Sequence, residues 1–415
     1  MRKSWLRAVC LALALLTGGA ALGEQVYFSG EGKEAWYQDM LKDGILSVGN
    51  NRRLKDVIRR ALGGETVTVA AIGGSITEGA GAAKYDECYA SRFVQGFAAR
   101  YGAGDGSNVK FVNAGVGGTP STFGLMRYDR DVAARVKDGD GLADLVIVEF
   151  AVNDYQEPTK HRCYESLVKK ILSQENKPAV ILLFAVFNGG FNLQGELKKV
   201  GETYDLMMVS IKDAAYPHIG KELSEKEFFF DQYHPTSMGH GIMADCLLAA
   251  VEEANARETD EADINLDVES AYGTEFMNLT TLYGSSPISA DAELIRGGFA
   301  HDDTGAYSNL PVGRVCGQNF HHDAVDGNDP LVFRATFRKL LIAWRAVSDP
   351  KYGEAEIWVD GKLKRTLKVA ADKWGQSEVI LLWDAKEPLE HTVEIRMSEE
   401  TKDKRFTITA ISYAQ

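Results

Sequence analysis

The chain has 415 residues, of which 45% are hydrophobic and 25% charged, so it is long enough for two or three domains with cores of their own. Its formal net charge of −13 at pH 7 disfavours binding to nucleic acids and to anionic membrane surfaces, because both repel an acidic protein. An uncharged substrate is more compatible with this charge.

The first residues have the order of features found in a secretory signal peptide. Arg2, Lys3 and Arg7 precede an apolar run at 8–16, and small residues follow up to Gly23. The run is too short to cross a bilayer, and no later segment has the pattern of a membrane span. We therefore expect residues 1–23 to be cleaved and the remaining chain to be secreted without a membrane anchor.

Four cysteines remain after this cleavage: Cys88, Cys163, Cys246 and Cys316. Export permits disulfide bonds between them, but their spacing matches no zinc-binding motif. The first three lie in stretches with a helical pattern, where we expect buried free thiols rather than bridges. We predict no bound metal and no cofactor.

Helical and strand-like patterns alternate in the first part of the chain. Apolar residues recur at helical spacing in 54–62 and stop at two glycines. Short apolar runs predict strands at 66–72, 109–113, 145–150 and 179–187. Helical patterns occur near 89–101, 120–136, 164–172 and 235–254. This alternation predicts a parallel sheet that is covered by helices on both faces.

Ser75 lies on a glycine-lined turn directly after the first of these strands, and Asp231 precedes His234 by three residues far downstream. A serine on such a turn can point its hydroxyl into open space, and a histidine held by a carboxylate can accept the hydroxyl proton. In a parallel sheet the ligand crevice lies beyond the carboxyl ends of the strands, where Ser75, Gly118 and Asn153 are all expected. The sequence therefore predicts a serine hydrolase.

Four blocks stand in order: Gly73-Gly74-Ser75-Ile76-Thr77, residues 113–119, Ala151-Val152-Asn153-Asp154, and residues 231–235. Together they resemble the SGNH (GDSL-type) hydrolases over roughly residues 66–254. The resemblance implies a flavodoxin-like three-layer α/β/α sandwich, which we assign to residues 24–255, and an esterase activity.

The resemblance also implies a role for each reacting residue. Ser75 is the nucleophile, His234 the general base, and Asp231 the carboxylate that orients the imidazole. The backbone amides of Ser75 and Gly118 and the side-chain amide of Asn153 form the oxyanion hole. Such fixed donors matter because the tetrahedral intermediate carries a full negative charge on the former carbonyl oxygen.

Two departures and two alternatives accompany this interpretation. The first block usually reads Gly-Asp-Ser and here has Gly74, and the third usually begins with glycine and here has Ala151. Asn153 and Asp154 could instead cap the helix that follows them. A phosphate-binding loop at residues 115–119 is a poor alternative, because the third glycine of that motif is absent.

The composition changes after residue 255. Residues 256–272 are acidic and lack strong periodicity, which predicts a linker or a short docking segment. Residues 273–415 contain short alternating strands and turn residues, which predict an antiparallel, jelly-roll-like β-sandwich. His321 and His322 in this region suit a metal site less well than a polar loop.

One hairpin in this domain contains Asp360-Gly361, which usually forms a two-residue turn. That register places Ile357 on the same face as Lys362, so we predict a three-residue loop, 359–361, which groups Ile357 with Leu363. Trp358 then faces solvent, and we hypothesise that its ring stacks on a sugar.

These features favour a secreted esterase that removes acetyl groups from polysaccharides, with an acylated carbohydrate as its partner. A lipid or lysophospholipid acylhydrolase of the same family is a second hypothesis. A catalytically inactive carbohydrate-binding protein is a third. The sequence identifies neither the sugar nor the oligomeric state.

Overall fold

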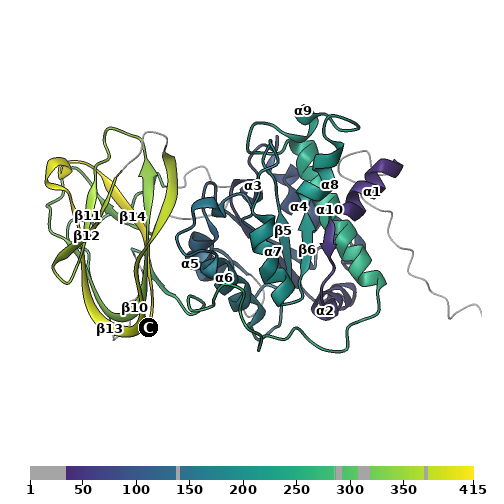
Figure 1. Cartoon of the computed structure of the whole chain (residues 1–415), viewed down its shortest axis with the longest axis horizontal. Coiled ribbons are helices and arrows are strands. Elements are labelled where there is room, and N and C mark those ends of the chain that lie inside the picture. Colours follow the sequence, from purple (N-terminus) through teal and green to yellow (C-terminus); the bar gives the residue numbers. More distant parts are fainter. Residues whose placement is uncertain (1–33, 137–140, 285, 287–291, 307–317, 369–372) are drawn as a thin grey trace, which may run out of the picture.

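The computed structural model describes residues 34–136, 141–284, 286, 292–306, 318–368 and 373–415. The predicted signal peptide, 1–23, and Cys316 lie outside these residues. The described part of the chain forms an α/β domain followed by a β domain (Figure 1). No helix within it has the length and hydropathy needed to span a bilayer.

A six-stranded sheet forms the centre of the α/β domain, with the order β1-β6-β5-β4-β2-β3. Its strands are β1 (Ile45–Ser47), β2 (Val67–Gly73), β3 (Val109–Gly115), β4 (Leu145–Glu149), β5 (Ala179–Phe184) and β6 (Met207–Ser210). All neighbours are parallel except β1 with β6. The five parallel strands have the flavodoxin-like order, which confirms the predicted fold.

Helices cover both faces of this sheet. They are α1 (Ala35–Asp43), α2 (Arg52–Leu62), α3 (Ser75–Glu78), α4 (Tyr89–Tyr101), α5 (Ser121–Asp131), α6 (Arg162–Leu172), α7 (Gln194–Thr203), α8 (Ile211–Ala215), α9 (Glu225–Phe228) and α10 (Ser237–Ala256). Short 3₁₀ turns are η1 (Tyr85–Glu87), η2 (Ala133–Arg135), η3 (Asp154–Gln156), η4 (Tyr216–His218) and η5 (Glu399–Thr401). The helical patterns read from the sequence coincide with α2, α4, α5, α6 and α10.

Successive residues of β2 contribute to two different cores, because side chains alternate across a strand. Val69 and Ala71 pack with α1, α2, α4, α8 and α10. Ala70 and Ile72 pack on the other face with α5, α6 and α7. The central strands are therefore buried on both sides, which explains why they read as continuous apolar runs in the sequence.

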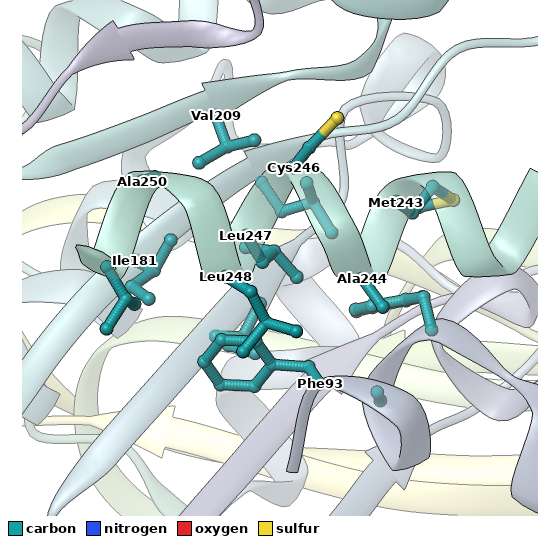
Figure 2. Packing of buried hydrophobic residues seen from close by; sticks show 14 of the residues in the cluster. Phe93, Ile181, Val209, Met243, Ala244, Cys246, Leu247, Leu248 and Ala250 are labelled. Carbon is teal, nitrogen blue, oxygen red and sulfur yellow. The ribbon is translucent and has the colours of Figure 1, made fainter. Parts of the chain in front are cut away.

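α10 is the most deeply buried helix of the first core. Figure 2 shows Leu247 and Leu248 of this helix pointing toward Phe93 of α4 and Ile181 of β5. Gly96 of α4 allows this approach, because a Cβ atom there would lie 2.5 Å from a methyl carbon of Leu248. Burying each such leucine stabilises the fold by about 1.5–3 kcal/mol relative to exposure. Cys88, Cys163 and Cys246 are buried free thiols, as expected.

The β domain is antiparallel throughout its named strands, as predicted. They are β7 (Thr280–Leu282), β8 (Ala292–Ile295), β9 (Phe320–His322), β10 (Leu331–Val347), β11 (Ala355–Val359), β12 (Lys362–Leu367), β13 (Trp374–Met397) and β14 (Phe406–Ala414). Hydrogen bonds connect all eight into one sheet. The first half of β10 pairs with β8 and its second half with β14, while β13 follows it throughout. The two long strands therefore belong to both layers around the core.

The hairpin between β11 and β12 differs from the predicted three-residue loop. Val359 pairs with Lys362, so the turn has two residues, Asp360 and Gly361, both with positive φ (51° and 72°). A bulge follows in β12 and brings Leu367 opposite Ala355, where both side chains are buried. Leu363, which the predicted loop placed on the inner face, is 48% exposed instead.

The β domain is docked against the layer of α5 and α6, which lies between it and the central sheet in Figure 1. Leu341 and Ala343 of β10 belong to the same apolar cluster as these helices. Arg162 of α6 forms ion pairs with Glu275 (2.7 Å) and Asp384 (2.8 Å). The second domain therefore braces the face of the sheet opposite α10.

The segment that joins the domains also lies against the first domain. The carboxylate of Glu165 in α6 accepts hydrogen bonds from the backbone amides of residues 271–273. Near α2, Arg53 forms an ion pair with Asp263 at 2.7 Å. At least one acidic residue of this segment thus forms an ion pair with a basic side chain of the α/β domain.

Candidate active site

The strands that precede three of the sequence blocks end level with one another. Gly73 at the end of β2 pairs with Gly115 of β3 and with Glu149 of β4. The residues that follow these strands therefore emerge at one edge of the sheet, and α3 lies beyond that edge in Figure 1. This edge is the place where ligands bind in sheets of this topology.

Ser75 is the first residue of α3, a single helical turn that packs against β3. The Asn113 side chain donates to the carbonyl oxygen of Thr77 at 2.7 Å and accepts from the amide of Gly115 at 2.8 Å. A Cβ atom at Gly115 would lie 2.1 Å from the backbone nitrogen of Glu78, so only glycine permits this contact. The backbone around the serine is thereby fixed.

Ser75, His234 and Asp231 form a continuous hydrogen-bonded row. Nε2 of His234 lies 3.0 Å from Oγ of Ser75, and its Nδ1 lies 2.9 Å from Oδ2 of Asp231. His234 is partly buried and Asp231 is exposed. The structure thus brings together the three residues that the sequence analysis placed in a triad, at distances that permit proton transfer.

Asp231 is held as an acceptor of several hydrogen bonds. Its Oδ1 accepts from the backbone amides of Tyr233 (2.7 Å) and His234 (2.8 Å). Partial burial raises the pKa of this carboxyl, but the bonds from the His234 ring and from these two amides lower it more, so the net pKa lies below the ordinary value. Asp231 is therefore ionised at neutral pH and can orient the imidazole.

The predicted oxyanion donors lie around the same turn. Gly118 has φ of 66°, the left-handed region that favours glycine, and is exposed at the loop after β3. The side chain of Asn153 packs directly on Gly74, where a Cβ atom would lie 2.1 Å from its Oδ1. Asn153 therefore occupies the space beside the nucleophile turn that a side chain at residue 74 would need.

Buried polar residues that the sequence analysis did not single out support this edge. The hydroxyl of Thr77 donates to Glu149 at 3.1 Å and lies 2.8 Å from the hydroxyl of Tyr89. The fully buried Arg127 donates to the carbonyl oxygens of Gly73 (3.0 Å) and Ala114, which joins the ends of β2 and β3. A charged residue inside an otherwise apolar pattern was the available signal for Glu149 and Arg127.

Two buried carboxyls beneath the site have raised pKa values. Burial raises the pKa of Glu149 to about 7, although the Thr77 hydroxyl acts in the opposite direction. Burial also raises the pKa of Asp154 to about 8, against the hydrogen bond that its Oδ1 accepts from the amide of Ser121 at 2.7 Å. Asp154 thus binds the first residue of α5, which precedes it in the chain, and not the helix that follows it, as the alternative interpretation expected.

These raised pKa values predict that the protein loses stability as pH rises. In the unfolded chain both carboxyls ionise near pH 4, whereas the folded chain retains their protons up to about pH 7 to 8. The free energy of unfolding is therefore expected to fall by a few kcal/mol between about pH 4.5 and pH 8. Asp154→Asn, which keeps an acceptor for Ser121, should make this fall smaller.

Urea unfolding of both proteins at pH 5 and at pH 8 measures the effect. Equal losses of unfolding free energy in the wild type and in Asp154→Asn would contradict the assignment.

Other residues considered in the sequence have structural contacts. His240 is fully buried, its Nδ1 accepts from the amide of Tyr89 at 3.2 Å, and burial lowers its pKa to about 4. His321 bonds to the hydroxyl of Thr407 at 2.9 Å, and His322 to the carbonyl oxygen of Lys404. Within the described residues, no group of three or more histidine, cysteine or acidic side chains is arranged to hold a metal ion.

Trp358 is half-buried rather than fully open to solvent. The guanidinium carbon of Arg396 lies 4.3 Å from the ring centroid, and the indole NH donates to Glu356 at 2.9 Å. One face of the ring and its polar atom are thus already engaged. Sugar binding by Trp358 stays a prediction.

Residues 71–242 match the model of the GDSL-like lipase/acylhydrolase family. The α/β domain belongs to this family. The matched segment begins within β2 and ends within α10, so it contains all four blocks of the first domain. This confirms the resemblance read from the sequence and identifies the α/β domain as a GDSL-like acylhydrolase domain. A search of curated proteins finds no match.

Solved structures are similar over both domains. The crystal structure of a two-domain esterase active on acetylated mannans, co-crystallized with mannopentaose, has a TM-score of 0.74 and 25% sequence identity, and the match covers 90% of this chain and 98% of that one. A second structure of a two-domain esterase active on acetylated mannans has a TM-score of 0.73 and 25% identity, with coverage of 90% and 99%. The arrangement of an acylhydrolase domain followed by a β domain is therefore shared with an esterase of known structure.

Proposed function

We propose that this chain is a secreted serine esterase that removes acetyl groups from a neutral polysaccharide. The observation that carries the proposal is the hydrogen-bonded row of Ser75, His234 and Asp231 at the carboxyl edge of a parallel sheet. Similarity over both domains to an esterase active on acetylated mannans supports an acetylated carbohydrate as substrate. The net charge of −13 is compatible with an uncharged glycan.

The proposed reaction has two halves. Oγ of Ser75 attacks the ester carbonyl carbon while Nε2 of His234 accepts the hydroxyl proton. The bond from that carbon to the sugar oxygen then breaks, and the imidazolium returns the proton to the sugar oxygen, which leaves as a hydroxyl. Water attacks the acetyl-serine with the same histidine as base, which releases acetate and restores the Ser75 hydroxyl.

The oxyanion is stabilised in both halves by groups that are already in place. The amides of Ser75 and Gly118 and the Asn153 side chain supply donors without adding charge, and each such donor is worth about 3 kcal/mol of barrier. Asp231 stays ionised and stabilises the imidazolium that forms during attack.

The test is acetate release from acetylated mannan, xylan and pectin fragments, followed by mass spectrometry. The wild type is expected to release acetate from at least one of these glycans, and Ser75→Ala from none. Release at equal rates by both proteins would remove the nucleophile assignment, and no release by the wild type would exclude these substrates.

Esters of increasing acyl length separate the proposed function from the lipid acylhydrolase that the family name also covers. Acetate is expected to be the best substrate among p-nitrophenyl esters of acetate, butyrate and octanoate. A preference for octanoate would favour the lipid hydrolase. No turnover of any ester would favour the catalytically inactive binding protein.

Export is part of the proposal because residues 1–23 have the features of a signal peptide. N-terminal sequencing of protein recovered outside the cytoplasm is expected to begin at Glu24. A product that retains Arg2 and Lys3 would contradict cleavage.

A further inference from the structure

Four aromatic rings form a continuous row beside the catalytic residues; we call Tyr155, Phe187, Phe191 and Tyr233 the aromatic ledge. The ring centroids of Tyr155 and Phe191 are 6.4 Å apart, those of Phe191 and Phe187 6.1 Å, and those of Phe187 and Tyr233 5.1 Å. The row ends 6.2 Å from the ring of His234. Because Tyr155 follows Asn153 by two residues, the ledge extends from the oxyanion block to the general base.

The rings of the ledge face water. Tyr155 is 59% exposed, Tyr233 48% and Phe191 44%, while Phe187 packs its inner side on the first core. Aromatic rings that are exposed together do not contribute the stabilising free energy that their burial would provide. A cluster of exposed apolar side chains next to a reacting group therefore indicates a surface that a ligand covers.

The loop that carries the two phenylalanines is held in place before any ligand arrives. Gly189 and Gly190 have φ of 99° and 82°, which forms a tight turn closed by a 3.0 Å bond from the amide of Phe187 to the carbonyl of Phe191. Leu193, just after the loop, donates its amide to the carbonyl oxygen of Ala151 in the third block, at 2.8 Å.

The loop is also joined to the triad segment. The amide of Asn188 donates to the carbonyl oxygen of Gln232 at 3.1 Å, and the Asn188 side chain donates to Glu225 at 2.8 Å. The loop thus bridges the oxyanion block and the residues beside His234. A preformed surface avoids the entropy cost of ordering a loop on binding.

We propose that the aromatic ledge binds the pyranose rings of the polysaccharide that flank the acetylated sugar. This rests on the proposed function and specifies where the glycan chain lies. A pyranose presents C–H groups on its faces, which stack on aromatic rings, and hydroxyls at its rim, which can bond to the tyrosine hydroxyls and to Asn188.

The composition of the ledge favours a glycan over an acyl chain. Its members are flat aromatic rings, two of them with hydroxyl groups, and polar residues border them. An acyl chain gains most from enclosure among aliphatic side chains, which remove its whole surface from water. The ledge is an open surface and so matches a flat, amphipathic ligand.

The inference also differs from the sequence-based hypothesis about Trp358 in the β domain. That ring is half-buried and is contacted by Arg396 and Glu356, whereas the ledge rings are open and adjoin the triad. The α/β domain itself therefore supplies the main aromatic contacts for the substrate.

The kinetic test compares a small ester with an acetylated glycan. Phe191→Ala and Tyr155→Ala are each expected to raise KM for acetylated manno-oligosaccharides about tenfold, since the sugars on either side of the ester lose a stacking partner. The kcat/KM for p-nitrophenyl acetate should change less than about twofold, because this ester is too small to reach along the ledge. Leu389→Ala, which alters an exposed residue of the β domain, serves as the control and should change neither parameter.

A direct measurement of sugar binding tests this inference independently of the proposed catalytic activity. Calorimetry on Ser75→Ala with mannopentaose, xylopentaose and cellopentaose requires no turnover, and adding Phe191→Ala is expected to weaken binding of the preferred oligosaccharide about tenfold. The proposal is overturned if none of these sugars binds Ser75→Ala, if the ledge variants leave binding and KM unchanged, or if they slow p-nitrophenyl octanoate but not the glycan. Failure of acetate release alongside sugar binding that depends on Phe191 would reject only the proposed function.

Discussion

Replacing Ser75 with alanine is expected to lower kcat for p-nitrophenyl acetate by about 10⁶-fold, and His234→Ala by a similar factor. The two atoms that exchange the proton lie 3.0 Å apart, so neither group can activate the ester without the other. Combining both substitutions should therefore cause little further loss. Asp231→Ala is expected to cost less, about 10⁴-fold, because the imidazole is retained and only its orientation and charge stabilisation are lost.

Initial rates on p-nitrophenyl acetate for the single and double variants measure these effects. Ser173→Ala, an exposed serine at the end of α6, is the matched control and should keep wild-type activity. A double variant whose loss equals the product of the two single losses would mean that Ser75 and His234 act independently. That result would contradict the triad, even if each single loss were large.

The sheet and the site could be read from the sequence because both depend on local patterns. The central strands are buried on two faces, so 67–73 and 145–149 are almost entirely apolar, a pattern that an amphipathic helix would not show. Ser75, Gly118 and Asn153 follow such strands. Because parallel strands end at one edge, their order along the chain was sufficient to bring them together in space.

The hairpin of the β domain shows what a local pattern cannot determine. A two-residue turn at Asp360-Gly361 places Ile357 on the same face as Lys362 when both strands alternate strictly, and this pattern favours a three-residue loop. The structure has the two-residue turn, Leu363 faces solvent, and a bulge in β12 brings Leu367 opposite the buried Ala355. An added residue in one strand shifts every later side chain, and nothing in the sequence marks its position.

The sequence analysis did not identify the buried polar residues that support the active site, and the reason is different. Arg127 lies in the middle of α5 and Glu149 at the end of β4. The contribution of each side chain to the site depends on hydrogen-bond partners in other elements. Arg127 reaches the carbonyl of Gly73, which is 54 residues away in the chain. The aromatic ledge likewise combines residues from three loops, so its continuity exists only in the folded chain.

A second large effect is expected for Gly74→Ala, which should lower kcat for p-nitrophenyl acetate by about 10²–10³-fold. A Cβ atom at this position would lie 2.1 Å from Oδ1, 2.7 Å from Cγ and 2.9 Å from Nδ2 of Asn153. Contacts this short force the Asn153 side chain to move, and removing one oxyanion donor typically has a cost of this size. The φ of Gly74 is −88°, outside the left-handed region, so the clash with Asn153 is the main obstacle to alanine here.

Because the clash acts through one neighbour, Gly74→Ala and Asn153→Ala are expected to cause similar losses, and the double variant should be no slower than either. Gly195→Ala is the matched control: it lies in α7, a Cβ atom there meets nothing within 4 Å, and activity should be unchanged. Full activity of Gly74→Ala would mean that Asn153 does not bind the oxyanion.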